Sequence, residues 1–142
     1  MRFPRVALIG VVLATAACSA AADADSADPT PPAVRTLLDG LSATADSVAD
    51  QQAALAAAVD PVGGLSGCAA ATSTIRFEPV WAAVHPVPQW RPSSGAPPAG
   101  EVYEVPSVLR IVRDGRIAGT DLATLHVGVQ DGVARLVPFC IQ

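Results

Sequence analysis

The sequence predicts an α+β domain in which N-terminal helices pack on a curved, mostly antiparallel, four-stranded sheet with a cone-like shape. Three observations support this fold class. Apolar residues recur at helical spacing between residues 31 and 59, β-branched residues gather in runs from Thr72 onward, and Asp-Gly pairs separate those runs. About 110 residues are enough to bury one modest core.

Two helices are expected, at residues 31–43 and 46–59. Thr30 offers a hydroxyl at the first cap, and Pro31 and Pro32 suit a first helical turn, where no amide hydrogen is needed. Gly40 and the small polar residues 42–46 weaken the middle of the segment, which favours two helices over one rod. The apolar stripe consists of Val34, Leu37, Leu38, Leu41, Val48, Leu55 and Val59.

Four strands are expected, near residues 73–84, 102–112, 116–129 and 133–141. The Asp114-Gly115 and Asp131-Gly132 pairs, each between apolar runs, predict tight hairpins. The third strand is long and carries Gly119 and Gly128, so it is expected to bend as the sheet curls. The segment 86–100 holds five prolines and is expected to be a loop.

The N-terminus has the pattern of an export signal. Two arginines precede the apolar run from Val6 to Leu13, which is too short to span a bilayer, and small residues lead to Cys18. This pattern resembles the lipobox of bacterial lipoproteins, which implies cleavage before Cys18 and attachment of fatty acyl chains such as palmitate. The alternative is ordinary secretory cleavage near residues 20–22, which leaves no lipid. The expected organisation is a signal peptide over 1–17, a lipidated cysteine and acidic tether over 18–30, and one domain over 31–142.

Three cysteines are an odd number for an exported chain. Lipid on Cys18 leaves Cys68 and Cys140, which are expected to form a disulfide outside the cytoplasm. It would close a loop of roughly 70 residues and contribute about 4 kcal/mol on the chain-entropy model. The alternative is a pair of buried free thiols.

Charge excludes one class of partner. Without residues 1–17, seven of the nine basic residues remain against thirteen acidic ones, a net charge of −6, so no nucleic-acid partner is expected. The negative charge gathers before Asp60, where it would hold the domain away from an anionic membrane surface. Every basic residue is arginine, which suggests a GC-rich genome.

The order of these features resembles the low-molecular-weight secreted antigens and lipoproteins of mycobacteria and other actinobacteria. The resemblance rests on residues 29–41, on Pro61-Val62-Gly63-Gly64 and on the strand-rich C-terminal half. It implies a nuclear-transport-factor-like, cystatin-like cone and a location at the extracytoplasmic face of the cell membrane. It implies no activity, and the two later cysteines and the proline-rich loop depart from the group.

A few residues are candidates for chemistry or binding. Cone folds include enzymes similar to ketosteroid isomerase, in which an aspartate and a tyrosine line an apolar pocket. A tight turn at Asp114-Gly115 would place Tyr103 opposite His126, whereas strand parity puts Asp121 on the other face. The alternative is that Tyr103 and His126 form a solvent-facing cross-strand pair.

Metal and cofactor sites are not expected. Only His85 and His126 are available as histidine ligands, about 40 residues apart, whereas a metal site needs three or four ligands. Trp81 and Trp90 flank the proline-rich loop and are the candidate binding anchors. For Trp81, placed in a strand, a packing role is favoured; for Trp90 both roles stay open.

The sequence favours a non-catalytic, membrane-anchored envelope lipoprotein that binds a partner protein or an apolar small molecule. One alternative is a small-molecule enzyme with a pocket in the cone, lined by Tyr103 or Asp121. Another is a structural surface antigen without a pocket.

Overall fold

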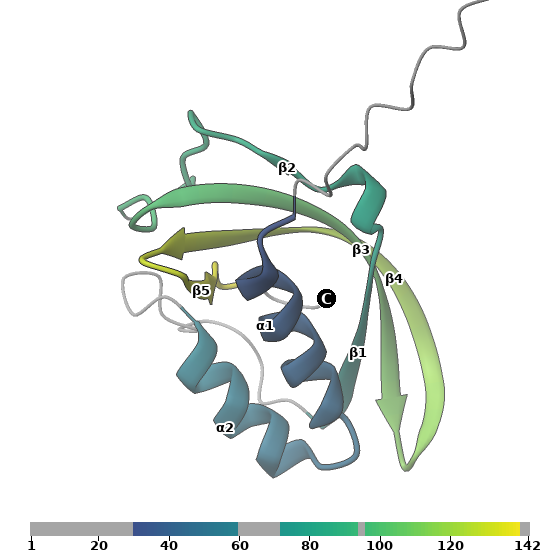
Figure 1. Ribbon diagram of the computed structural model, residues 1–142. Coiled ribbons are helices and arrows are strands. Elements are labelled where there is room, and N and C mark those ends of the chain that lie inside the picture. Colours follow the sequence, from purple (N-terminus) through teal and green to yellow (C-terminus); the bar gives the residue numbers. More distant parts are fainter. Residues whose placement is uncertain (1–29, 60–71, 94–95, 140–142) are drawn as a thin grey trace, which may run out of the picture.

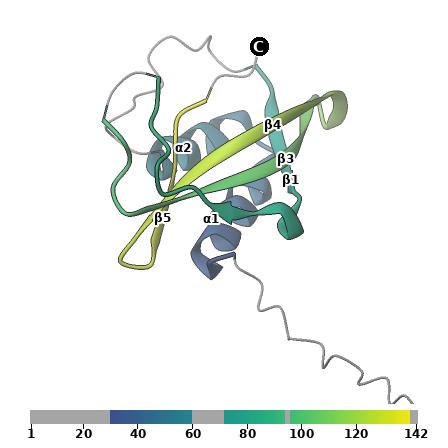
Figure 2. The same cartoon turned by 90° about the horizontal axis from the view of Figure 1, so that it is seen from above.

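Two helices lie in the hollow of a curled antiparallel sheet in the computed structural model of the protein (Figure 1). The structure describes residues 30–59, 72–93 and 96–139. The leader, the tether, Cys18, Cys68 and Cys140 lie outside these residues, so the lipid and disulfide predictions stay predictions. The α+β class and the helices on the concave face are confirmed, and Figure 2 shows β3 and β4 crossing over both helices.

Helices α1 (Pro32–Ala43) and α2 (Val48–Ala58) lie close to their expected positions. The predicted Thr30 cap is wrong: Pro31 is the N-cap of α1, with no side-chain cap bond, and Pro32 occupies the first turn. In α2 the Ser47 hydroxyl accepts a hydrogen bond from the Asp50 amide at 3.2 Å. Among the described residues no helix is long and apolar enough to cross a membrane.

The sheet has five strands instead of four, because the expected first strand is broken. Strands β1 (Thr74–Pro79) and β2 (His85–Pro86) pair with the same edge of β3 and are separated by a short 3-10 turn, Trp81–Ala83. The pairing of β1 with β3 stops at Pro79, which lies opposite Ser107 and next to Pro106. It stops there because Pro79 and Pro106 have no amide hydrogen to donate to the ladder. The remaining strands are β3 (Glu101–Arg113), β4 (Arg116–Gln130) and β5 (Val133–Leu136), in the order β1-β3-β4-β5.

Both Asp-Gly hairpins form as predicted. Asp114 and Asp131 have φ angles of 52° and 51°, and the glycine after each also has positive φ, as a two-residue turn of this kind requires. One irregularity interrupts the β3–β4 ladder: Val112 pairs with Ile117 whereas Ile111 pairs with Gly119, so Ala118 is an extra residue, a β-bulge.

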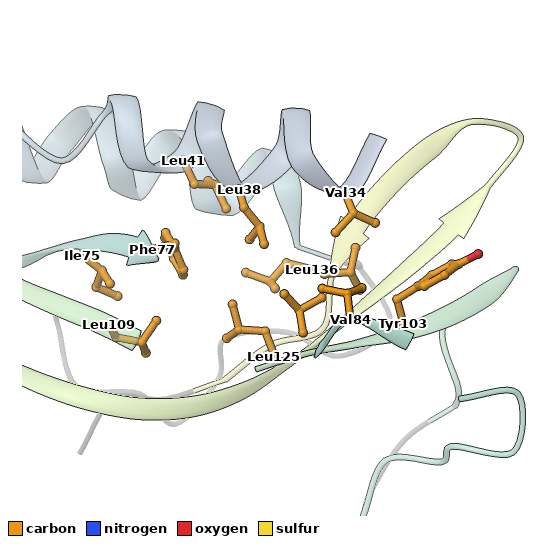
Figure 3. Packing of buried hydrophobic residues seen from close by; sticks show 12 residues of the cluster. Val34, Leu38, Leu41, Ile75, Phe77, Val84, Tyr103, Leu109, Leu125 and Leu136 are labelled. Atoms are coloured by element: carbon orange, nitrogen blue, oxygen red, sulfur yellow. The ribbon is translucent and has the colours of Figure 1, made fainter. Parts of the chain in front are cut away.

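The core lies between α1 and the concave face of the sheet (Figure 3). Alternate residues of each strand point inward, and the side chains of α1 meet them. Phe139, after β5, packs edge-on against Phe77 with 6.2 Å between ring centroids. The fully buried members are Val34, Leu38, Val105, Leu109, Leu125, Val127 and Leu136.

Polar side chains from the helices cover the free edge of β1. The buried Gln51 amide donates to the carbonyls of Leu41 (3.0 Å) and Ile75 (2.7 Å) and accepts from the Ile75 amide at 2.7 Å. The Ser42 hydroxyl bonds the amide and the carbonyl of Phe77. The backbone groups that β1 turns away from β3 are thus paired, and the helices are fixed to the sheet by directional bonds as well as by apolar contact.

Candidate functional site

The predicted Tyr103–His126 pair is wrong, and the bulge is the reason. Near the turn the register is the expected one, but beyond Ala118 it shifts by one residue. Tyr103 therefore lies opposite Val127 on the concave side, and Glu104 lies opposite His126 on the outer face. A one-residue shift moves a side chain to the other face of a sheet.

Tyr103 is part of the core, with 8 % of its surface exposed. Its side chain is drawn in Figure 3, and its hydroxyl donates to the Glu101 carboxylate. This bond, followed by burial and the negative charge of Glu101, raises the pKa of Tyr103 to about 12. The phenol is therefore neutral and held in place over the physiological pH range.

The interior of the curled sheet is filled between the described residues. Leu38 and Leu41 of α1 meet Phe77, Leu109 and Leu125 there (Figure 3). Asp121 lies opposite Leu109, in the half of β4 that follows the Asp114-Gly115 turn, and is exposed. Tyr103 is thus buried in the core whereas Asp121 is exposed, so among the described residues these two side chains do not line a shared pocket.

The outer face brings together three polar or aromatic side chains. The Trp90 ring stacks on the His126 ring, with 4.3 Å between centroids and 24° between planes. The Glu104 carboxylate lies 3.7 Å from His126 Nε2. Burial lowers the pKa of His126, and the negative charge of Glu104 opposes that effect. Two of the predicted site residues, Trp90 and His126, thus form a contact pair.

Trp90 belongs to a strap across the outer face, which we define as the described residues 87–93 and 96–99. The strap is fixed at its start by the Val87 amide, which donates to the Val102 carbonyl at 2.7 Å. At its other end it lies so close to β4 that a Cβ on Gly128 would approach Pro98 Cβ to 3.0 Å and the Ala99 carbonyl oxygen to 3.2 Å. Gly128 therefore permits the strap to lie against the sheet.

A pocket of about 290 Å³ opens beside the strap, at the same end of the sheet. Its lining includes two small residues, Gly128 and Ala99, and one larger apolar residue, Val133. The polar side chains of the lining come from β4, the β4–β5 turn and β5: Gln130, Asp131 and Arg135. We call this pocket, together with Trp90, Glu104 and His126, the proximal outer surface.

Trp81 has a separate environment. It lies in the 3-10 turn and not in a strand as predicted, and the Arg35 guanidinium of α1 lies 4.2 Å from its ring centroid. Trp81 also packs against the core cluster. The predicted packing role fits this position.

His85 of β2 lies opposite Glu104, so the two histidines flank one carboxylate on the outer face. The His85 Nδ1 atom lies 3.0 Å from the Ala83 carbonyl oxygen. In the described part of the chain no three His, Cys, Asp or Glu side chains are grouped closely enough to hold a metal ion.

Sequence reasoning missed Glu104, Gly128 and Arg135. A glycine within an otherwise β-branched strand was the available signal for Gly128, because it marks close backbone approach. The chain matches no protein-family model, no curated protein and no solved structure.

Proposed function

We propose that the protein is a non-catalytic lipoprotein of the cell envelope, anchored to the extracytoplasmic face of a membrane through Cys18, that binds a partner protein through the proximal outer surface. The resemblance to actinobacterial antigen-type lipoproteins is part of the same proposal. The observation that carries the binding function is the half-buried Trp90 ring stacked on His126, which lies two residues along β4 from the pocket residue Gly128.

The composition of this surface favours a polypeptide ligand. Tryptophan and arginine are the residues that most often dominate protein–protein binding energy, and here Trp90 and Arg135 lie at the same end of one face. The pocket offers an amide, a carboxylate and the Arg135 guanidinium, one nitrogen of which already donates to the Ala57 carbonyl at 3.0 Å. These groups suit the backbone and polar side chains of an extended segment. On the concave side, by contrast, the described residues present packed apolar side chains, among them Leu38 and Leu41.

The binding proposal is tested by affinity capture from detergent-solubilised envelopes, with captured proteins quantified by mass spectrometry. Trp90→Ala should reduce capture of a specific partner about 30-fold, the loss expected for an anchor worth about 2 kcal/mol. Val48→Ala is the control, since Val48 is a 36 % exposed apolar residue of α2 that lies outside the proximal outer surface. Equal capture by the wild-type chain and Trp90→Ala would contradict the proposal.

Gly128→Ala gives a second measurement. The added methyl group would meet Pro98 and the Ala99 carbonyl, so the strap must move while the core residues stay in place. Capture should fall although the urea midpoint changes little. A variant that binds as the wild-type chain does would remove the strap from the binding surface.

The anchor is tested separately. The wild-type chain should incorporate labelled palmitate and sediment with membranes, whereas Cys18→Ser should be unlabelled and released. An unlabelled wild-type chain whose N-terminus begins after residue 20 would establish ordinary secretion instead.

A further inference from the structure

We infer that the distal part of the outer face is a contact surface for a second copy of this chain. We call this region the distal outer surface; it is separate from the strap and the pocket. Its apolar members are Val80, Pro106, Val108, Ile117 and Leu122, and its polar members are Glu78, Arg110 and Thr120.

The strand register places the members from β1, β3 and β4 on one face of the sheet. Glu78, Val108 and Leu122 lie in one row across β1, β3 and β4, and Arg110 and Thr120 lie in the next. The bulge at Ala118 keeps Ile117 on the face of Leu122, since the odd spacing between them would separate them in a regular strand.

The exposure of this surface is unusual for a face that only meets water. Leu122 is 77 % exposed, Ile117 62 % and Val80 48 %. A solvated face of an antiparallel sheet normally carries polar side chains at these positions, and exposed large apolar side chains grouped together mark a contact site.

The charges on this surface favour a second copy over an anionic membrane or a charged partner. Arg110 donates to the Glu78 carboxylate and to the Thr120 hydroxyl, at 3.0 Å in each case. Arg76 of β1, which lies opposite Arg110, pairs with Asp46 at 2.9 Å. The charges of Arg76 and Arg110 are thus each paired with a carboxylate. An apolar patch that carries both signs can complement a second copy of itself across a two-fold axis.

The size of the surface predicts a weak contact. Strand spacing and rise give an extent of about 20 Å along the strands and about 10–15 Å across them. A few hundred Å² per copy is below the roughly 800 Å² of a stable interface. The expected dissociation constant is therefore in the range from about 1 μM to about 1 mM.

Sedimentation equilibrium of the full chain with Cys18→Ser tests the inference, since without lipid no micelle contributes to the mass. The mass should rise toward twice the monomer value as the concentration passes through this range. Leu122→Asp should keep the chain monomeric at an unchanged thermal midpoint, because that side chain is mostly exposed. Val48→Asp, at a 36 % exposed position of α2 outside both outer surfaces, is the matched control and should leave association intact.

Three results would overturn the inference. One is a monomeric wild-type chain over the whole concentration range, and another is an equal loss of association in both variants. The third is a monomeric chain that floats with phosphatidylglycerol vesicles and loses this binding in Leu122→Asp, which would assign the surface to a membrane.

Discussion

Gln51 offers the sharpest test of how the helices are fixed to the sheet. Its side chain is 2 % exposed and makes three hydrogen bonds to backbone groups of α1 and β1. Gln51→Leu keeps nearly the same volume and removes all three. The substitution therefore asks what the directional bonds contribute beyond apolar packing.

The expected magnitude follows from the partners left behind. The Leu41 carbonyl keeps the Thr44 amide and hydroxyl as donors, at 3.3 and 2.8 Å, so only the amide and the carbonyl of Ile75 lose a partner. Each unpaired buried group costs about 1–3 kcal/mol, and replacing a buried amide by an apolar side chain returns about 1 kcal/mol. The net loss is about 1–5 kcal/mol, compared with the roughly 5–15 kcal/mol that stabilises a domain.

Urea unfolding followed by far-UV circular dichroism measures this loss, and the thermal midpoint should fall by roughly 5–25 °C. Gln89→Leu is the control, because it makes the same chemical change at an exposed turn position and should shift stability by less than about 0.5 kcal/mol. If Gln51→Leu were as stable as the wild-type chain, the bonds to Ile75 would carry no net stability and this account of the β1 edge would be wrong.

Two predictions concern ionisation. Because the folded-state pKa of His126 lies below its usual 6.5, the stacked arrangement with Trp90 is favoured above pH 6.5 and is weakened as the pH falls through the lower, folded-state pKa. The fluorescence of Trp90 in Trp81→Phe reports the midpoint of this change, which Glu104→Gln should move to lower pH. Tyr103 is the single tyrosine, so its ultraviolet titration is unambiguous: phenolate should appear near pH 12 in the folded chain and closer to 10 in Glu101→Gln, and an unchanged midpoint would contradict the hydrogen bond.

The sequence contained enough information for the fold, because local signals determine it. Helical spacing predicted both helices to within about two residues, and the Asp-Gly pairs predicted both hairpins with their turns. The candidate site depended on features that local patterns do not encode. The broken first strand depends on two prolines that are distant in sequence and meet only in the sheet, and the strap depends on contact between Pro98 and Gly128.

The error at Tyr103 leads to a test of the bulge itself. Leu125 and Val127 are buried on the concave side, and the two-residue turn at Asp114-Gly115 sets the ladder at the other end of the hairpin. The register that the turn sets and the register that the buried residues require differ by one residue, and the extra residue Ala118 accounts for the difference. Because it stands outside the ladder and is exposed, its deletion should leave a regular ladder with every core residue in place, at a cost within about 1 kcal/mol.

Deletion of Thr124, which pairs with Pro106 within the regular part of the ladder, can use the spare residue at Ala118 only if residues 119–123 all change faces. That change turns the exposed Leu122 toward the core and the half-buried Ala123 away from it. Otherwise the strand must slip, which turns the buried residues after position 124 away from the core. Turning Leu125 and Val127 outward alone forfeits about 3–6 kcal/mol of apolar burial, enough to unfold a domain of this size. Urea unfolding of the two deletions decides the matter, since similar stabilities would mean that Ala118 is not what reconciles the turn with the core.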